Sequence, residues 1–218
     1  MIEMKINKTK WILLGFVALS FILTMIVYPI LPDKMPVHWN YHGEIDSYAG
    51  KFQGAFMIPI MLLIFYPLFI YLPNIDPRRK NYKKFEGAYD TIIIAIFAFL
   101  TAMHVIVLSA SLGYKIDMTA YMTIGLSLLF IILGNVLTRI RPNFFVGIKN
   151  PWTLSDDDVW KKTHRLGGWL FVLVGILGLF LLLINSKFAA MSEIGGIIAA
   201  SLIVTIYSYI LYKSKMSD

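Results

Sequence analysis

The chain has 218 residues, of which 58% are hydrophobic and 15% are charged, and its formal net charge is +7. Soluble domains are about 45–50% apolar and about 25% charged, so this composition excludes an ordinary soluble protein and indicates a membrane protein. Excess positive charge in a membrane protein serves topology and contacts with anionic headgroups, so direct binding of nucleic acid is not expected. The absence of cysteine excludes thiol catalysis, disulfides and thiolate metal sites.

Six apolar runs are long enough to cross a bilayer, because a hydrocarbon core about 30 Å thick needs roughly 20 apolar residues as a helix. They cover residues 11–31, 55–73, 91–112, 119–138, 167–185 and 193–212. Backbone groups in lipid must be bonded within their own segment, and no run alternates like a barrel strand, so all six are predicted helices. The predicted fold class is all-α, a polytopic membrane helix bundle with six transmembrane helices. The first run is too long for a signal peptide and lacks a cleavage site, so we expect a retained anchor.

Lysine and arginine are unevenly distributed between the segments that connect these runs. Sixteen lie in the N-terminal tail, segments 78–84 and 139–166, and the C-terminal tail, whereas four lie in the other connections (Lys34, Lys51, Lys115 and Lys187). Short connections rich in lysine and arginine stay in the cytoplasm. The distribution therefore predicts a bacterial cell membrane protein with both termini cytoplasmic, residues 139–166 cytosolic and residues 32–54 external.

The predicted external loop contains prolines and a glycine that argue against a helix. Three interpretations are open: a turn-rich cap over the helix ends, a recognition surface for a molecule arriving from outside, and a divalent-metal site of histidines and acids (His38, His42, Glu44 and Asp46). The metal site is disfavoured, because histidines four residues apart share a face only in a helix and no His-Glu-x-x-His motif is present. The residues assigned to external recognition are His38, Trp39, Asn40, His42, Gly43 and Asp46.

Polar and small residues inside the spans carry separate predictions. His104 is the only ionisable residue in the middle of a predicted span. It fits a proton relay or ligand contact, or a neutral imidazole bonded to a neighbouring helix; the lack of a second ionisable residue favours the neutral imidazole. Asn135 is expected to bond across helices or back to the adjacent loop. Small residues in the last two spans predict close helix packing, with homodimerisation as the alternative (Gly168, Gly175, Gly178, Ser192, Gly196 and Ala200).

The segment 139–166 is charged and aromatic, so it lies at a membrane surface. Asn150-Pro151 predicts a turn, after which a helix over about residues 155–165 runs into the fifth span, with Thr153 or Ser155 as its N-cap. The acids of its first turn suit the helix dipole and predict two ion pairs at i,i+4 spacing, Asp157–Lys161 and Asp158–Lys162.

The arginines and the remaining acids of this segment allow further interpretations. Arg139 and Arg141 are expected to neutralise the acids or to bind lipid phosphate. A metal site on Asp156 and its neighbours is disfavoured because capping already uses these acids. Acid–base catalysis with His164 is disfavoured because no nucleophile is evident, so no catalytic residue is assigned.

Two motifs carry a resemblance to a known family. Gly147-Ile-Lys-Asn-Pro-Trp-Thr-Leu154, followed by Val159-Trp160 and Arg165, resembles the signature of the bacterial SdpI immunity proteins, including the YfhL branch. Leu31-Pro-x-x-Met-Pro-Val-His-Trp-Asn and Gly43-x-x-Asp46 resemble the DUF1648-type region that commonly precedes that signature. Lys149 stands where the family pattern has Arg, which keeps the charge but loses the bidentate fork. The signature residues are Arg141, Gly147, Lys149, Pro151, Trp152, Thr153, Leu154, Trp160 and Arg165.

The resemblance implies a non-enzymatic membrane immunity protein that gives resistance to a secreted, membrane-active peptide toxin. It also implies signalling by sequestration of a cytosolic transcriptional repressor, and a division into a DUF1648-like region (1–90) and an SdpI-like region (91–218). The expected partners are the lipid bilayer, an extracellular peptide toxin and that repressor, with no cofactor and no resident metal. The alternatives are a small transporter or channel, marked by His104, and an intramembrane metal-dependent hydrolase that uses His38, His42 and nearby acids.

Overall fold

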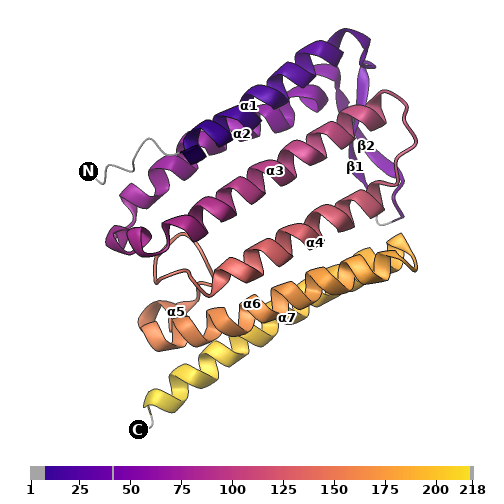
Figure 1. Ribbon diagram of the computed structural model, residues 1–218. Helices are drawn as coiled ribbons and strands as arrows, with labels where there is room; N and C mark the ends of the chain where they lie inside the picture. Colours follow the sequence, from indigo (N-terminus) through magenta and orange to yellow (C-terminus); the bar gives the residue numbers. More distant parts are fainter. Residues whose placement is uncertain (1–7, 41, 217–218) are drawn as a thin grey trace.

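The computed structural model describes residues 8–40 and 42–216. Six of its helices are long and apolar enough to cross a membrane, in agreement with the predicted spans (Figure 1). They are α1 (Lys8–Val27), α2 (Lys51–Ile75), α3 (Glu86–Ser111), α4 (Met118–Leu137), α6 (Asp157–Leu182) and α7 (Ser186–Met216). The fold class is confirmed: the chain is a multi-pass membrane helix bundle.

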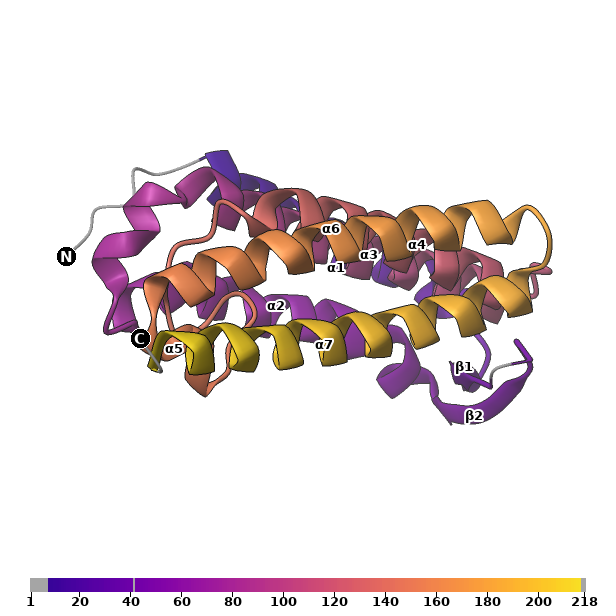
Figure 2. The same cartoon turned by 90° about the horizontal axis from the view of Figure 1, so that it is seen from below.

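Shorter elements lie at the two ends of the bundle. One end carries the 3₁₀ turn η1 (Tyr28–Ile30) and the antiparallel strands β1 (Lys34–Trp39) and β2 (Ile45–Gly50). The opposite end carries the 3₁₀ helix η2 (Arg79–Lys84) and the short helix α5 (Pro151–Ser155), next to the start of α1 and the end of α7 (Figures 1 and 2). We call the first the hairpin end and the second, which includes residues 138–156, the loop end.

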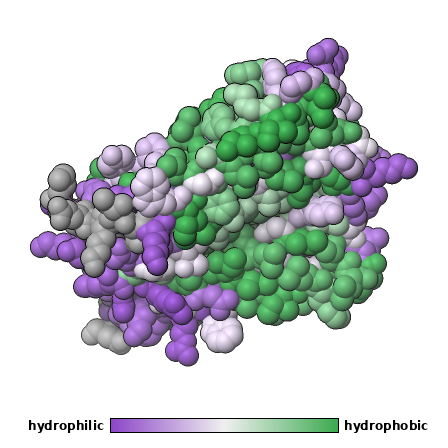
Figure 3. Space-filling view, turned by 45° about the horizontal axis from the view of Figure 1, so that its top comes forward, coloured by the Kyte–Doolittle hydropathy of each residue, from purple (hydrophilic) through white to green (hydrophobic). Residues whose placement is uncertain are grey.

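The outer surface of the bundle is apolar between these two ends. Large aliphatic and aromatic side chains face outward along all six helices, as expected where lipid replaces water. In the face seen in Figure 3 a hydrophobic band lies between hydrophilic regions, the larger of which is at the loop end. Helices that are apolar on every side are typical of membrane spans.

The two halves of the bundle pack in different ways. Helices α1, α2 and α3 share a core of large side chains that includes Leu13, Leu62 and Phe97. Helices α4, α6 and α7 approach closely through small residues, because a Cβ atom at Gly134 would meet the backbone oxygen of Gly168. Gly196 likewise lies against α6. The small residues therefore serve packing within the chain, the first of the two predicted alternatives.

The hairpin is the main addition to the predicted fold, because the sequence indicates turns there and not strands. Met35 is fully buried and packs with residues of α2 and α3, and Gly54 of α2 leaves room for its side chain. Pro36 lies where the strand pairing is irregular, consistent with its missing N–H group. Tertiary contact through Met35 thus holds a segment whose own composition favours turns.

Candidate functional site

The loop that follows α4 is folded around the fully buried side chain of Asn143. Its amide nitrogen donates to the carbonyl oxygens of Arg141 and Val146, both at 2.9 Å. Its amide oxygen accepts from the backbone N–H groups of Phe145 at 2.9 Å and Val146 at 2.7 Å. One side chain thereby satisfies four backbone groups of a loop that has no regular structure of its own.

Asp76, just after α2, joins this loop to the α2–α3 connection. Its buried carboxylate accepts from the backbone N–H of Arg78 at 2.6 Å, the backbone N–H of Phe144 at 2.9 Å and the hydroxyl of Tyr82 at 3.1 Å. Burial raises the pKa of Tyr82 above its ordinary value, and the neighbouring Asp76 charge raises it further, so the phenol stays a neutral donor. The same connection supplies Asn81, whose amide donates to the Pro142 carbonyl at 2.8 Å.

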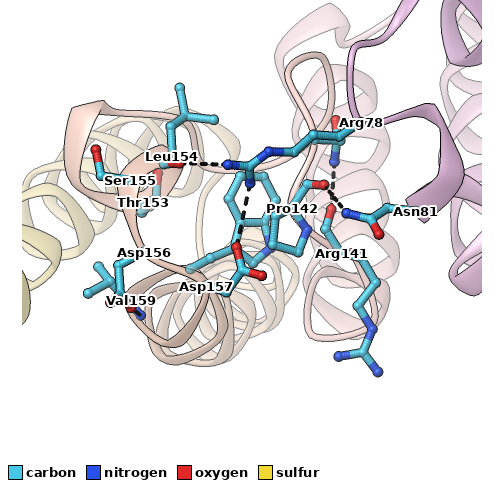
Figure 4. Close-up of polar contacts among 12 residues, drawn as sticks. Arg78, Asn81, Arg141, Pro142, Thr153, Leu154, Ser155, Asp156, Asp157 and Val159 are labelled. Atoms are coloured by element: carbon cyan, nitrogen blue, oxygen red, sulfur yellow. Dashed lines mark hydrogen bonds and ion pairs between the residues drawn. The ribbon is translucent and has the colours of Figure 1, made fainter.

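Arg78 extends this link to the start of α6. One guanidinium nitrogen donates to the Leu154 carbonyl at 3.0 Å, and another lies 3.5 Å from the Asp157 carboxylate (Figure 4). Its guanidinium also lies 5.4 Å from the centre of the Phe144 ring. Arg78 therefore takes the position beside the acids that was predicted for Arg139 and Arg141. The predicted neutralisation of the acids by these two arginines is wrong, and their binding of lipid phosphate stays a prediction. Arg141 points away from Asp157 in Figure 4.

Gly147, Trp160 and His164 form a closely packed cluster at the loop end. Trp160 and His164 are buried and stacked, with ring centres 4.1 Å apart. The Trp160 indole N–H donates to the Ile140 carbonyl at 2.9 Å. Gly147 has φ +115°, and a Cβ atom there would collide with His164. Glycine is therefore required both for this backbone conformation and for the space that it leaves to the His164 ring.

The contacts of His164 fix its tautomer. Nε2 accepts from the backbone N–H of Ile148 at 3.0 Å, and Nδ1 lies 2.8 Å from the Trp160 carbonyl. A carbonyl only accepts and an N–H only donates, so the ring is neutral with its proton on Nδ1. Both nitrogens are occupied, so His164 serves the loop and is not arranged as a catalytic base.

The N-caps of α5 and α6 differ from the prediction. Asn150 caps α5 through a reciprocal capping box with Thr153, whose side chain also donates to the Ile148 carbonyl at 3.0 Å. Asp156 caps α6 by accepting from the N–H groups of Asp158 and Val159, both at 2.8 Å. Thr153 and Ser155 are therefore not the N-caps of α6, because the chain forms two helices here, α5 and α6, where one was predicted.

The acids at the start of α6 are held by cations from three elements. Lys215 at the end of α7 lies 2.9 Å from Asp156 and 3.2 Å from Asp158. The predicted pair Asp158–Lys162 is confirmed at 2.9 Å, whereas Asp157 pairs with Arg78 in place of Lys161. Hydrogen bonds from the Val159 N–H and from Lys215 hold the pKa of Asp156 below its ordinary value.

The other predicted signature residues lie around this framework. Lys149 donates to the carbonyls of Phe144 and Phe145, at 3.2 and 2.8 Å, so this lysine, which stands where the family pattern has Arg, supports the loop backbone. Trp152 packs on Tyr209 of α7, with ring centres 5.2 Å apart. The exposed signature residues, which remain available to a partner, are Arg141, Lys149, Pro151 and Arg165.

Two hollows open at the loop end. The first, about 600 Å³, is lined by residues of both signs, including Lys84, Arg141, Asp157, Asp158 and Lys161. The second, about 430 Å³, lies between α4 and α6 and brings together the predicted residues Asn135 and Arg165 with Lys161 and Trp169. Asn135 donates to the Ile131 carbonyl of its own helix at 2.8 Å, and the bond expected across helices or to the loop is absent among the described residues.

At the hairpin end three of the predicted recognition residues are exposed (His38, His42 and Asp46) and three are half-buried (Trp39, Asn40 and Gly43). His38 Nδ1 lies 2.5 Å from Asp46 Oδ1, a pair that links β1 to β2. The Asn40 side chain closes the turn by accepting from the N–H groups of His42 and Glu44 and donating to the Glu44 carboxylate. Gly43 has φ +79° and packs against Thr119 of α4.

Two of the potential metal ligands at this turn, His38 and Glu44, have partners within the hairpin. Among residues 8–40 and 42–216, no group of three or more His, Cys, Asp or Glu side chains converges in a way that could hold a metal ion. His38 is paired with Asp46 while Glu44 bonds Asn40, so these potential ligands face different partners.

Two polar centres lie within the bundle, where one was predicted. His104 is fully buried, and its Nε2 lies 2.8 Å from the hydroxyl of Thr24 on α1, the neighbouring-helix contact expected for a neutral imidazole. Glu193 is the second centre: the predicted sixth span begins at this residue, but α7 begins at Ser186, so Glu193 lies inside the helix. It is 3% exposed and accepts from Ser127 at 2.9 Å.

Comparison with known proteins agrees with this architecture. Residues 139–213 match the SdpI/YfhL protein family, and residues 15–63 match a domain of unknown function, DUF1648. The chain is 28% identical over 197 residues to "Immunity protein SdpI" of Bacillus subtilis (strain 168), covering 90% of this chain and 92% of that protein. It is 35% identical over 59 residues to "Uncharacterized membrane protein YbgB" of the same strain, covering 27% of this chain and 62% of that protein. No solved structure matches the chain.

Six spans joined by a tightly bonded loop define a multi-pass α-helical membrane protein. Within that class, the resemblance to the SdpI immunity proteins is confirmed, and the SdpI/YfhL family is the one that the C-terminal part of the chain matches. The match to the SdpI/YfhL family includes every signature residue from Arg141 to Arg165. The two matched regions, 139–213 and 15–63, are shorter than the predicted regions 91–218 and 1–90, and no match covers the predicted boundary at residue 90.

Several residues of the loop end were missed by the sequence analysis. Asp76, Arg78, Asn81 and Tyr82 lie in the α2–α3 connection, about 60 to 80 residues before their partners in the loop and at α5. The only signal in the sequence is that charge places both connections on the same side of the membrane. The distribution of positive charge predicts that the two connections lie on the same side of the membrane, but it does not predict that they touch each other.

Proposed function

We propose that this chain is a membrane immunity protein that protects a bacterial cell from a secreted, membrane-active peptide toxin. The observation that carries the proposal is the similarity to "Immunity protein SdpI", which spans 90% of the chain and so includes both ends of the bundle. A similarity confined to one motif would support a shared fold element. One that covers the hairpin, the spans and the loop supports a shared role.

In this proposal the hairpin end faces outside and the loop end faces the cytoplasm. The two tails and segments 78–84 and 139–166 hold sixteen of the lysines and arginines, and the other connections hold four. Positively charged connections remain inside. A toxin that arrives from outside then meets the hairpin first. Its exposed side chains include His38, 66% exposed, and Tyr48, 57% exposed.

The loop end offers a surface suited to a soluble partner. The hollow of about 600 Å³ is lined by charges of both signs, which fits a protein surface better than a simple anion. Residues that build the loop are bonded to one another, so the hollow is held in one shape and binding costs little ordering entropy. We propose that a cytosolic repressor, the partner implied by the family resemblance, docks here.

Protection is tested in a bacterium sensitive to a secreted depolarising peptide. Cells that express the chain should survive the peptide and keep their membrane potential, measured with a voltage-sensitive dye, while cells with an empty vector should not. The variant Trp39→Ala, on the hairpin, should reduce survival at equal membrane abundance. Equal killing and equal depolarisation with and without the chain would reject the proposed function.

Docking of a repressor is tested separately by cell fractionation. A tagged helix-turn-helix repressor encoded beside the gene should move to the membrane fraction when the chain is present. Arg141→Glu, which reverses a charge in the hollow, should return it to the soluble fraction, whereas Lys187→Glu at the hairpin end should not. If both variants behave alike, the hollow is not the docking site.

A further inference from the structure

A pocket of about 190 Å³ lies at the hairpin end and is separate from the loop-end residues described above. Its walls come from the end of β1, from α4 and from the first turns of α7, and they include Trp39, Asn40, Thr119, Thr123, Ala190 and Glu193. Figure 2 shows the hairpin beside the starting end of α7. The pocket therefore begins at the surface that the sequence analysis assigns to external recognition.

Glu193 is the only charged side chain among the described residues that line this pocket. It is 3% exposed and held by the Ser127 hydroxyl of α4 at 2.9 Å. A Cβ atom on Gly178 of α6 would contact both Ser127 and Glu193, so glycine is needed where the three helices meet. The carboxyl group is thus built into the packing of α4, α6 and α7.

A row of hydroxyl groups leads from the hairpin toward Glu193. Thr119, Thr123 and Ser127 are spaced four residues apart and so share one face of α4. Gly43 of the hairpin turn packs on Thr119, and Thr123 donates to the Thr119 carbonyl at 2.9 Å. A polar edge in an otherwise apolar bundle end gives a charged group a path to the carboxyl.

Electrostatics decides what kind of group this pocket prefers. An ionised carboxylate within a membrane helix is costly, and one hydroxyl donor offsets only part of that cost. No lysine or arginine of residues 8–40 and 42–216 lines the pocket. A bound cation would supply the missing charge, and the aromatic ring of Trp39 adds a favourable face for it, whereas an anion would be repelled.

We propose that this pocket binds an organic cation, an ammonium or guanidinium group that enters from the hairpin end, with Glu193 as its counter-ion. A lysine or arginine side chain of the peptide toxin is the natural source of that group, and this identification rests on the proposed immunity function. The preference of the pocket for cations does not depend on it.

The absence of cysteine allows a direct test with single thiols. Ala190→Cys places a thiol in the pocket, and Tyr48→Cys places a reference thiol on the exposed hairpin. Purified protein in nanodiscs is treated with a trimethylammonium methanethiosulfonate or with its sulfonate counterpart. For each thiol, the rate of modification by the cationic reagent is divided by the rate of modification by the anionic reagent. This ratio should be about tenfold higher at the Ala190→Cys thiol than at the reference thiol, because a charged cleft concentrates the opposite charge.

A second substitution assigns that preference to the carboxyl group. Glu193→Gln keeps an oxygen acceptor for Ser127 and removes the charge, so the rate ratio should fall to that of the reference thiol. Glu86→Gln, the same chemical change on an exposed residue at the loop end, should leave it unchanged. Equal ratios at the two thiols, or a high ratio that survives Glu193→Gln, would overturn the proposal.

Competition keeps the proposal testable if Glu193→Gln does not fold. Butylammonium should slow modification of the Ala190→Cys thiol with Glu193 intact, and butanol should not; equal effects of the two would count against cation binding. The result is also independent of protection. If the chain protects cells but shows no cation preference, the proposed immunity function stands and the proposed cation site is rejected. If it shows the cation preference but does not protect cells, the cation site stands and the immunity function is rejected.

Discussion

The loop end and the hairpin end are built in opposite ways. At the loop end, side chains from the α2–α3 connection, α6 and α7 bond an irregular loop, which is also held by its own Asn143; Asp76, Asn143 and Trp160 are buried. At the hairpin end, two short strands lie over the helix ends, anchored through Met35, while His38 and Asp46 remain largely exposed. The most distinctive stretch of the sequence is therefore mainly a structural framework, whereas the less distinctive hairpin presents exposed side chains such as His38 and Asp46.

This difference separates stability from recognition. Substitutions at the buried loop-end residues should unfold the loop and affect function indirectly. Substitutions on the hairpin should change recognition while the bundle keeps its stability.

Two tryptophans on α6 provide the sharpest contrast. Trp160→Ala removes a buried ring and its bond to Ile140, so the free energy of unfolding should fall by about 3–5 kcal/mol. Trp169→Ala removes a ring that is 70% exposed at the bundle surface, so the free energy of unfolding should change by less than about 1 kcal/mol. Thermal unfolding in detergent measures both. Similar melting temperatures for the two variants would contradict a loop end held by buried packing.

Two aspartates at the loop end separate a buried hub from a surface pair. Asp76→Asn puts an amide with N–H donors where the carboxylate accepts three hydrogen bonds, and it should cost about 1–3 kcal/mol. Asp157→Asn affects a side chain that is 79% exposed, so its effect should lie within about 0.5 kcal/mol. Limited proteolysis of the loop should therefore accelerate in the Asp76 variant alone.

Asp156 predicts a pH dependence that is specific to the loop end. Its folded-state pKa lies below its ordinary value of 3.8, so its charged contribution is present above that value and is lost as pH falls through the lower folded-state pKa. Asp156→Ala should cost about 1 kcal/mol at neutral pH through loss of the cap, whereas asparagine keeps most of it. The melting-temperature advantage of wild type over Asp156→Asn should therefore shrink below about pH 4. A constant difference between pH 7 and pH 3 would show that the charge contributes nothing.

The hairpin pair should give the smallest effect on stability. His38→Ala removes an exposed partner of Asp46, and exposed pairs contribute less than about 1 kcal/mol, so the melting temperature should hardly change. Protection in the depolarisation assay should nevertheless fall. Lys34→Ala, on the same strand but outside the predicted recognition residues, is the control for that assay. A large loss of stability from His38→Ala would show that the hairpin is a structural element like the loop.

The spans were predictable because lipid imposes a simple rule on the sequence. Backbone groups must be bonded locally and side chains must be apolar, so six runs suffice to predict six helices. The limits of the last span were less certain, because Ser186 to Ser192 is not strongly apolar and joins α7 through packing. Because α7 begins seven residues before the predicted span, Glu193 lies inside the helix and is buried, and not at its end.

The candidate residues were predictable by type and less so by role. Gly147, Thr153 and Trp160 were singled out by the signature motif, but their buried contacts follow only from the folded loop. Arg141 was expected to neutralise the acids or to bind lipid phosphate, yet Arg78 and Lys215 contact the acids. Lys149, which stands where the family pattern has Arg, bonds backbone carbonyls. A charge pattern gives the number of possible pairs and does not select one.

The sequence by itself determined the class of protein, the number of spans and the family resemblance, because hydropathy and short motifs are local properties of a chain. Only the tertiary structure decided that Asp76 meets Phe144, that Arg78 meets Leu154 and that Ser127 meets Glu193. Each of these contacts joins residues about 70 positions apart. Which distant residues meet depends on how the helices pack against one another, and no local pattern specifies that packing.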